Sequence, residues 1–153
     1  MKIIILAPVY NDFKSISKLI DEINSKIFGL NIIFSIIIVN DASTEQQSIY
    51  SPNLENIQSI QIINMKENRG HGRCIAAGLK YIFENEEFDY VIPMDADGED
   101  RPEEIKDFVE YINYSPKKTI VGERIKRSEN FFFKFCYSAH KILTLHLPGT
   151  QLS

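Results

Sequence analysis

The sequence of 153 residues has little of what several classes of protein need. It contains two cysteines, Cys74 and Cys136, too few for a disulfide framework or a cysteine metal cluster, which favours a reducing, cytoplasmic setting. The formal net charge of −4 gives no global excess of positive charge, so we expect no nucleic-acid partner. No apolar stretch reaches the roughly 18 residues of a membrane-spanning helix. The apolar start, residues 1–6, is too short for a signal peptide.

Short β-branched runs alternate with stretches of helical periodicity. The apolar runs predict strands at residues 3–6, 34–39, 60–63, 90–94 and 119–121. Apolar residues at helical spacing predict helices over residues 13–27, 75–83 and 105–112. Asn11 or Asp12 can cap the first helix, and Pro102 lies near the start of the third. This alternation predicts an α/β fold with a mainly parallel sheet flanked by helices.

Two carboxylates one residue apart, Asp95 and Asp97, directly follow the fourth predicted strand. Open α/β folds bind ligands at the carboxyl edge of the sheet. Like charges this close repel each other unless a positive charge lies between them, and carboxylates are hard oxygen ligands suited to Mg²⁺ or Mn²⁺. The pattern predicts a metal–diphosphate site, and the alternative is a pair of solvated loop aspartates.

Three further polar motifs lie next to predicted strands or helices. Residues 7–12 follow the first strand, residues 39–44 follow the second, and residues 68–73 lead into the second helix. A parallel sheet brings such loops to the edge that carries Asp95 and Asp97. This convergence is stronger evidence for a ligand site than any single motif.

Two side chains in these loops could contact a nucleoside. Asp41 can accept hydrogen bonds from a base imide or a ribose hydroxyl, and its structural alternative is to cap the next helix. Tyr10 can offer an aromatic face to a base, and its alternative is to pack as a half-buried tyrosine.

The third motif combines glycine with basic residues. Gly70 and Gly72 permit a tight turn and close approach to phosphate, although glycine also simply starts or ends helices. Arg69 and Arg73 can neutralise phosphate, or be solvated as most exposed arginines are. His71 has no Cys or His partner at ligand spacing, so we expect a polar loop residue first and a ligand second.

Taken together, these motifs resemble the nucleotide-sugar-binding half of a family 2 glycosyltransferase with the GT-A fold. The subgroup they resemble is the dolichol-phosphate mannose synthase-like enzymes, which glycosylate polyprenyl phosphates. The resemblance runs from residue 3 to about residue 127. It is carried by Pro8-Val9-Tyr10-Asn11-Asp12, Val39-Asn40-Asp41-Ala42-Ser43, Asn68-Arg69-Gly70-His71-Gly72, Met94-Asp95-Ala96-Asp97 with Pro102-Glu103, and Val121-Gly122-Glu123-Arg124.

The resemblance implies a Rossmann-like GT-A fold and a role for each matching residue. Asp95 and Asp97 would form the metal and diphosphate motif for Mg²⁺ or Mn²⁺, with Asp97 as the direct ligand. Arg124 would lie near the phosphates or the acceptor, and it completes the expected catalytic set with the two aspartates. The residues expected to bind the nucleotide sugar are Pro8, Tyr10, Asp12, Asp41, Asn68, Gly70, Gly72, Arg73 and Asp95.

The chain also departs from the family pattern. Asp12 stands where the family usually has Glu, and Gly98-Glu99-Asp100 replaces the more common Leu-Gln-His. The family's catalytic domain normally continues with an acceptor-side carboxylate segment and an arginine-containing stretch, for which nothing after Arg127 is a candidate. We therefore expect a nucleotide-sugar-binding domain at residues 1–127 and an incomplete acceptor side at residues 128–153. The chain would then be a fragment, come from an interrupted gene, or be completed by a partner.

The C-terminal part mixes aromatic residues with lysine and arginine. Residues 126–147 can form an amphipathic helix that lies on an anionic membrane, a helix that packs on a partner, or ordinary core. The first alternative would make the protein peripheral to the inner face of the membrane. Whether the chain forms a homo-oligomer is left open.

The implied reaction transfers a sugar from a UDP- or GDP-linked donor to an acceptor, for which a polyprenyl phosphate is one candidate. A phosphate acceptor needs no general base, because its second pKa of about 6 leaves it largely ionised at neutral pH. A phosphatase of the aspartyl-phosphate type also uses Asp-x-Asp after a strand, but normally on the first strand and with Thr or Val following, where this chain has Gly98 and Glu99. The other alternative is a domain that binds nucleotide sugar without turning it over.

Overall fold

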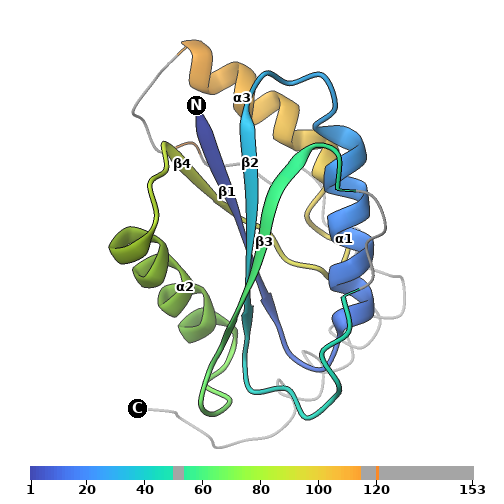
Figure 1. Ribbon diagram of the computed structural model, residues 1–153, viewed down its shortest axis with the longest axis vertical. Helices are drawn as coiled ribbons and strands as arrows, with labels where there is room; N and C mark the ends of the chain where they lie inside the picture. Colours follow the sequence, from blue (N-terminus) through green and yellow to red (C-terminus); the bar gives the residue numbers. More distant parts are fainter. Residues whose placement is uncertain (50–53, 115–119, 121–153) are drawn as a thin grey trace, which may run out of the picture. The chain divides into compact units, whose positions relative to one another are not determined.

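The computed structural model describes residues 1–49, 54–114 and 120. In these residues a four-stranded sheet with the order β3-β2-β1-β4 forms the centre of the fold (Figure 1). Every neighbouring pair of strands is parallel. The strands are β1 (Lys2–Val9), β2 (Ile33–Asn40), β3 (Ile57–Asn64) and β4 (Tyr90–Pro93).

The two central strands are apolar at almost every position. Residues 3–6 of β1 are fully buried, and β2 is buried from residue 34 to residue 40. Successive side chains of a strand point to opposite faces, so a strand that is apolar throughout suits a sheet covered on both faces. The strands β3 and β4 are only partly buried, and among the described residues each has a neighbouring strand on one side alone.

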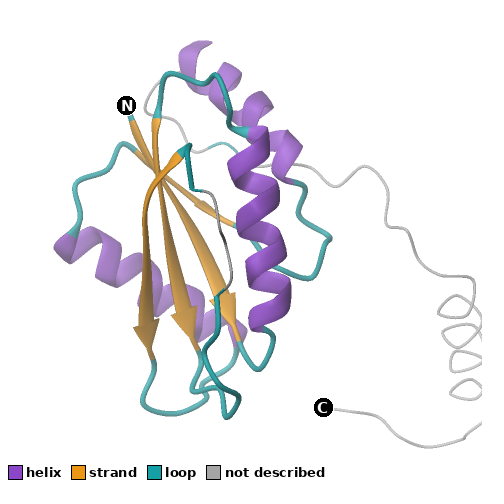
Figure 2. Cartoon of the chain, turned by 45° about the vertical axis from the view of Figure 1, so that its right-hand side comes forward, coloured by secondary structure: helices purple, strands orange, loops and turns teal. Residues whose placement is uncertain are grey.

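Helices cover the two faces of the sheet (Figures 1 and 2). The helices α1 (Phe13–Lys26) and α3 (Ile105–Tyr114) lie on one side, and α2 (His71–Asn85) lies on the other. A short 3-10 helix, η1 (Pro102–Glu104), leads into α3. None of the helices in the described ranges is long and apolar enough to cross a bilayer.

The helix α1 begins at a side-chain cap and buries one face. Asp12 is the N-cap, and its Oδ1 accepts a hydrogen bond from the backbone N–H of Ser15 at 3.0 Å. The apolar residues that follow at helical spacing turn toward the sheet, and the buried ones are Phe13, Ile16, Leu19, Ile20 and Ile23.

The helix α2 packs very closely on the sheet. Its Cys74 and Ile82 join a buried cluster with Ile4, Leu6, Ile37 and Val39 of the central strands. Gly78 makes this approach possible. A Cβ atom at this position would lie 2.8 Å from Cγ2 of Val39 and closer still to Cδ1 of Leu6.

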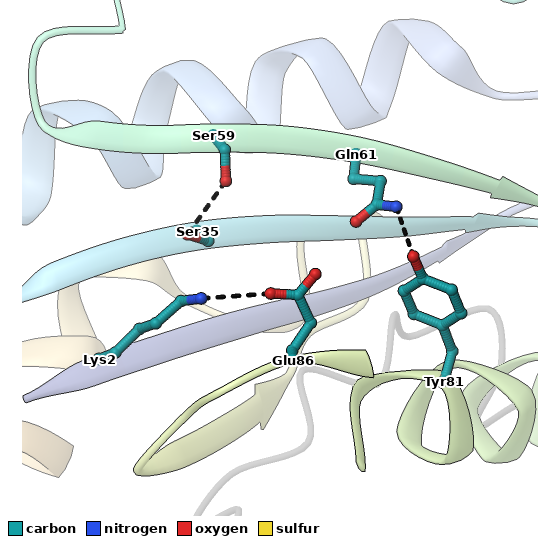
Figure 3. Close-up of polar contacts among 6 residues, drawn as sticks. All are labelled: Lys2, Ser35, Ser59, Gln61, Tyr81 and Glu86. Carbon is teal, nitrogen blue, oxygen red and sulfur yellow. Dashed lines mark hydrogen bonds and ion pairs between the residues drawn. The ribbon is translucent and has the colours of Figure 1, made fainter. Parts of the chain in front are cut away.

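Polar contacts add to this packing (Figure 3). Nζ of Lys2 lies 3.2 Å from Oε2 of Glu86, just past the end of α2. The amide of Gln61 on β3 donates to the hydroxyl of Tyr81 on α2 at 2.7 Å. A third contact joins β3 to β2, where the hydroxyl of Ser59 donates to that of Ser35 at 3.1 Å.

The predicted alternation of strands and helices and the parallel sheet are confirmed. Several predicted segments were too short, however: β3 begins at Ile57 rather than at residue 60, and α2 begins at His71 rather than at residue 75. The predicted fifth strand at residues 119–121 lies outside the described residues apart from Ile120. The chain divides into two compact units, Met1–Lys118 and Thr119–Ser153, and the features described here belong to the first. The proposed boundary after residue 127 stays a prediction.

Candidate functional site

The loops that follow the four strands all leave the sheet at its carboxyl edge, because the strands are parallel. The chain runs from β1 outward to β2 and β3, and then crosses to β4 on the other side of β1. Strand order therefore reverses between β1 and β4. Open α/β sheets bind ligands at such a switch point, next to the carboxyl ends of the strands. The strands β1 and β4 lie side by side at this point (Figure 1). Tyr10 follows β1 and Asp95 follows β4, so these two predicted site residues flank the switch point.

The β1 loop presents both polar and aromatic groups. Pro8 is half-buried within β1 and pairs in register with Val39, and Tyr10 is 51% exposed just past the strand. Asp12 is exposed, and one of its carboxylate oxygens caps α1. Between them Asn11 has a positive φ of 52°. Of the two candidate caps for α1, Asp12 is the one used.

Asp41 joins two loops that are far apart in the sequence. It is 4% exposed, and its two carboxylate oxygens accept hydrogen bonds at 2.8 Å from the backbone N–H groups of Arg69 and Gly70. Hydrogen bonds to an ionised acceptor are stronger than neutral ones. Asp41 thus shapes the segment immediately before α2. It does not cap this helix, because the N-cap is Gly70. Each carboxylate oxygen has a second lone pair, so the arrangement leaves acceptor capacity for a ligand.

The start of α2 is open toward the carboxyl edge. Gly70 is its N-cap and has a φ of 84°, a left-handed conformation that favours glycine. Gly72 lies in the first turn, where a Cβ would meet no atom of the described residues within 4 Å. The fold itself therefore places no demand for glycine at this position. Asn68 and Arg73 are exposed, and Arg69 forms an ion pair with Glu67.

The acidic loop after β4 is shaped by bonds within the loop. The backbone N–H of Asp95 donates to Oδ2 of Asp100 at 2.7 Å, and that of Glu99 donates to Oδ1 of Asp97 at 2.8 Å. Gly98, with a φ of 84°, permits the turn between them. Asp95 is half-buried and Asp97 is exposed. The two carboxylates therefore lie at a solvent-accessible position on the edge.

His71, which the sequence ranked as a loop residue before a ligand, is the first residue of α2. Its Nε2 lies 3.5 Å from Oδ1 of Asp95. This contact brings the start of α2 and the acidic loop together across 24 residues of sequence. The motif made both residues candidates, but the contact needs the fold and could not be inferred from spacing.

The donor set of the acidic loop fits a metal ion that also binds a ligand. Within the described ranges no group of three or more His, Cys, Asp or Glu side chains is arranged to hold a metal ion by itself. Mg²⁺ is usually held by one or two carboxylates together with substrate phosphates and water, so a complete protein cage is not required. Asp95 and Asp97 provide two hard carboxylates of this kind.

Cys74 lies beneath the edge rather than in it. It is fully buried, and its Sγ donates to the carbonyl oxygen of Val39 at 3.2 Å. Burial raises the pKa of the Cys74 thiol to about 11, and the negative charge of Asp41 acts in the same direction. The thiol is therefore protonated and unreactive at neutral pH, which makes it a packing residue.

Two other regions bear on the site. Arg124 and the aromatic and basic segment at residues 126–147 lie outside the described residues, so their roles stay predictions. A shallow depression of about 250 Å³ is lined by residues 33–34 and 55–58 at the amino ends of β2 and β3. It lies at the opposite edge of the sheet from the carboxylates, and its lining offers no catalytic group besides Glu55.

The fold and the candidate site define a parallel α/β domain whose carboxyl edge carries an acidic loop and a helix that begins after a glycine. The model of the family described as Glycosyl transferase family 2 matches residues 4–150. The chain belongs to this family.

Curated relatives agree with this assignment. An uncharacterized glycosyltransferase of Synechocystis is 30% identical over 130 residues, which are 78% of this chain and 38% of that protein. The undecaprenyl-phosphate 4-deoxy-4-formamido-L-arabinose transferase of Proteus mirabilis is 27% identical, with 87% and 40% covered. The UDP-N-acetylglucosamine–dolichyl-phosphate N-acetylglucosaminyltransferase of Methanococcus voltae is 27% identical, with 84% and 54% covered. The chain thus spans about half or less of the length of these relatives.

Solved structures agree on the fold. The crystal structure of S. aureus TarS 1-349 in complex with UDP-GlcNAc has a TM-score of 0.60 to this chain at 23% identity, covering 84% of this chain and 38% of that one. The crystal structure of TarS 1-349 in complex with UDP gives the same TM-score of 0.60. The predicted GT-A fold class and the resemblance to family 2 glycosyltransferases are therefore confirmed.

Proposed function

We propose that this domain binds the nucleoside diphosphate of a nucleotide sugar at its carboxyl edge, as the donor-binding part of a glycosyltransferase. The observation that carries the proposal is the junction at the switch point. There the acidic loop meets the first turn of α2 through His71 and Asp95, 3.5 Å apart. Carboxylates for a cation and helix N–H groups for an anion are the two kinds of group that a metal-bound diphosphate needs.

The nucleoside would occupy the β1 and β2 side of the edge. Pro8 and Tyr10 supply an apolar and aromatic surface, on which a base can stack. Asp12 and Asp41 supply acceptors for a base imide or ribose hydroxyls. Asp41 is held in place by its two backbone bonds, so its remaining lone pairs point from a fixed position.

The diphosphate would lie between the acidic loop and α2. Asn68 and Arg73 are exposed near the start of α2 and can donate to phosphate oxygens. Gly70 and Gly72 leave the backbone of the first turn uncovered, which lets phosphate approach closely.

Asp95 and Asp97 would hold Mg²⁺ or Mn²⁺ together with the diphosphate. In this proposal Asp97 is the direct ligand, because its Oδ2 has no hydrogen-bond partner among the described residues. When bound there, the ion supplies Lewis-acid stabilisation of the negative charge on the leaving diphosphate. His71 orients Asp95, and Arg124 adds positive charge near the phosphates or the acceptor.

The acceptor proposed for the complete enzyme is a polyprenyl phosphate. The names of the Proteus mirabilis and Methanococcus voltae relatives specify undecaprenyl phosphate and dolichyl phosphate. A phosphate oxygen that is already ionised can attack the anomeric carbon without a general base. A lipid acceptor would also place the enzyme at the inner face of a membrane, where the aromatic and basic residues 126–147 would make contact.

The test is isothermal titration of the chain with UDP, GDP and their sugars, first with Mn²⁺ and then with EDTA. The informative variant is Asp97→Asn, which removes the charge but keeps an oxygen to accept the Glu99 N–H. The matched control is Asp21→Asn on the exposed face of α1. We expect metal-dependent binding of one nucleotide that Asp97→Asn weakens at least tenfold and Asp21→Asn leaves unchanged.

Turnover separates the enzyme from its alternative. Release of nucleoside diphosphate from the sugar donor in the presence of polyprenyl phosphate would support the transferase. Binding without release would support a domain that only holds nucleotide sugar. No binding of any nucleotide by the folded chain would contradict both.

A further inference from the structure

We propose that Asn11 is a positioning residue of this site, whose side chain sets the spacing between the two loops that flank the nucleoside. The inference rests on the proposed function. Asn11 lies between Tyr10 and Asp12, which are expected to bind the nucleotide sugar, but it is not itself among the expected binding residues.

The backbone of Asn11 points its side chain toward the β2 loop. Its φ of 52° is left-handed, a conformation that asparagine adopts more readily than most residues. In this conformation Oδ1 accepts from the backbone N–H of Thr44 at 2.8 Å and from that of Glu45 at 3.2 Å. The hydroxyl of Thr44 lies 3.4 Å from the same oxygen.

The β2 loop also holds the backbone of Asn11. The N–H of Asn11 donates to Oγ of Ser43 at 2.8 Å, and the N–H of Ser43 donates to Oδ1 of Asn40 at 3.0 Å. The bonds between Asn11 and residues 43–45 form a clasp in which each loop donates to the other. The clasp joins segments that are 32 to 34 residues apart in sequence.

The clasp lies where it can determine the geometry of the site. On one loop it is flanked by Tyr10 and Asp12, and on the other it follows Asp41 by two residues. A backbone bond from Asp41 N–H to the Val9 carbonyl, 2.8 Å long, extends the pairing of β1 and β2 up to this point. Beyond that bond the pairing of β1 and β2 ends, and the hydrogen bonds of the clasp hold the two loops together.

The clasp is better placed to order loops than to stabilise the whole fold. The bonds from Asn11 Oδ1 to residues 44 and 45 are exposed, so their loss leaves groups that water can satisfy. The core that sets global stability lies below, among the buried strand residues. We therefore expect changes at Asn11 to alter ligand affinity more than the unfolding midpoint.

Two substitutions isolate the acceptor from the backbone conformation. Asn11→Gly tolerates the positive φ but lacks the oxygen, and Asn11→Asp keeps both. The control is Asn24→Ala on α1. The Asn24 Oδ1 also accepts a backbone N–H, that of Asn56 at 3.0 Å, but at the amino end of β3. All variants are made in the full chain, at about 0.15 M salt so that the added charge of aspartate is partly screened.

The readouts are calorimetric titration with the nucleoside diphosphate that binds wild type, titration with pyrophosphate and Mn²⁺, and amide hydrogen exchange at residues 44 and 45. For Asn11→Gly we expect about a tenfold loss of nucleotide affinity and faster exchange, a change of the size of one or two hydrogen bonds. Pyrophosphate binding should not change, because the acidic loop is untouched. The nucleotide affinity of Asn11→Asp should stay within about threefold of wild type, and that of Asn24→Ala should equal wild type.

Two results would overturn the inference alone: wild-type nucleotide affinity in Asn11→Gly, or equal losses for nucleotide and pyrophosphate. The second would mean that the substitution damages the whole edge rather than the nucleoside end. If wild type binds no nucleotide, the proposed function fails and the positioning role fails with it. That outcome is distinguished because it appears before any variant is compared.

Discussion

Alanine at Gly72 and alanine at Gly78 should change the stability of the protein in opposite directions, although both positions lie in α2. Gly78 is buried where the helix crosses the sheet, and a Cβ there would overlap Cδ1 of Leu6 and lie 2.8 Å from Cγ2 of Val39. Both of these side chains are fully buried in a close-packed core, so displacing either one disturbs its neighbours. A Cβ at Gly72 would meet nothing within 4 Å among the described residues.

The expected magnitudes follow from two opposing effects. Replacing glycine with alanine inside a helix stabilises it by about 1 kcal/mol, because less conformational entropy is lost on folding. Overpacking a filled core costs about 1–3 kcal/mol. Gly78→Ala experiences both effects, and the severity of the overlap places it toward the upper end of that range. We therefore expect a net destabilisation of about 1–2 kcal/mol for Gly78→Ala and a stabilisation of about 0.5 kcal/mol for Gly72→Ala, which lies in the first turn.

The assay is urea unfolding followed by circular dichroism, with the midpoint and the slope fitted separately. Equal slopes would show that the variants unfold from the same kind of native state, so that midpoint shifts report stability. If Gly78→Ala proved as stable as Gly72→Ala, the close approach of α2 to the sheet would be refuted. Nucleotide titration adds a second contrast. Under the proposed function Gly72→Ala should bind more weakly while being more stable, since its methyl group would stand where phosphate approaches.

Further predictions concern residues around the edge. Ala42 has a φ of 56°, a conformation that is strained for alanine but not for glycine. Ala42→Gly should therefore raise the free energy of unfolding by up to about 1 kcal/mol in a urea titration. A lower free energy of unfolding would show that no strain is present there. Asp41→Asn keeps one acceptor oxygen for two N–H groups, and it should lower that free energy by about 1.5–3 kcal/mol; an unchanged value would contradict the bonds to Arg69 and Gly70. The pKa of Cys74 is raised from 9.0 to about 11 in the fold. The protonated thiol therefore contributes fully to the free energy of unfolding below pH 9, and this contribution is lost as pH rises toward 11. Thermal melts should show that loss in wild type, and Cys74→Ala should show less of it.

The sequence was sufficient for the elements whose own composition determines them. The strands β1 and β2 are apolar at nearly every position, and such runs have few alternatives to a sheet covered on both faces. The ends of helices and strands were harder to predict from the sequence. The helix α2 begins four residues before the first apolar residue that marked it, because Gly70 turns the chain there and polar residues occupy its first turn. Apolar periodicity carries no information about such a turn.

Helical spacing also predicted apolar positions without saying what covers them. Leu79 and Phe83 helped to identify α2, yet they are 41% and 80% exposed, whereas Ile82 is fully buried. The helix meets the sheet along the line of Cys74, Gly78 and Ile82, which the small residues make possible. A pattern of large apolar residues gives little weight to glycine and cysteine, so it marked the helix without indicating that Cys74 and Gly78 contact the sheet.

One part of the candidate site is held by hydrogen bonds between residues far apart in the sequence, and the other mainly by bonds between residues close in the sequence. On the nucleoside side, Asp41 and Asn11 bind backbone groups about 30 residues away, so that edge is already ordered by the fold itself. The acidic loop meets the start of α2 through Asp95 and His71, but its own shape rests on bonds between Asp95 and Asp100 and between Glu99 and Asp97, five and two residues apart. Such a loop keeps several negative charges close together at an exposed edge, and a bound cation would reduce their mutual repulsion. It follows that a metal-bound diphosphate should change the acidic loop and leave the opposite side of the edge as it is.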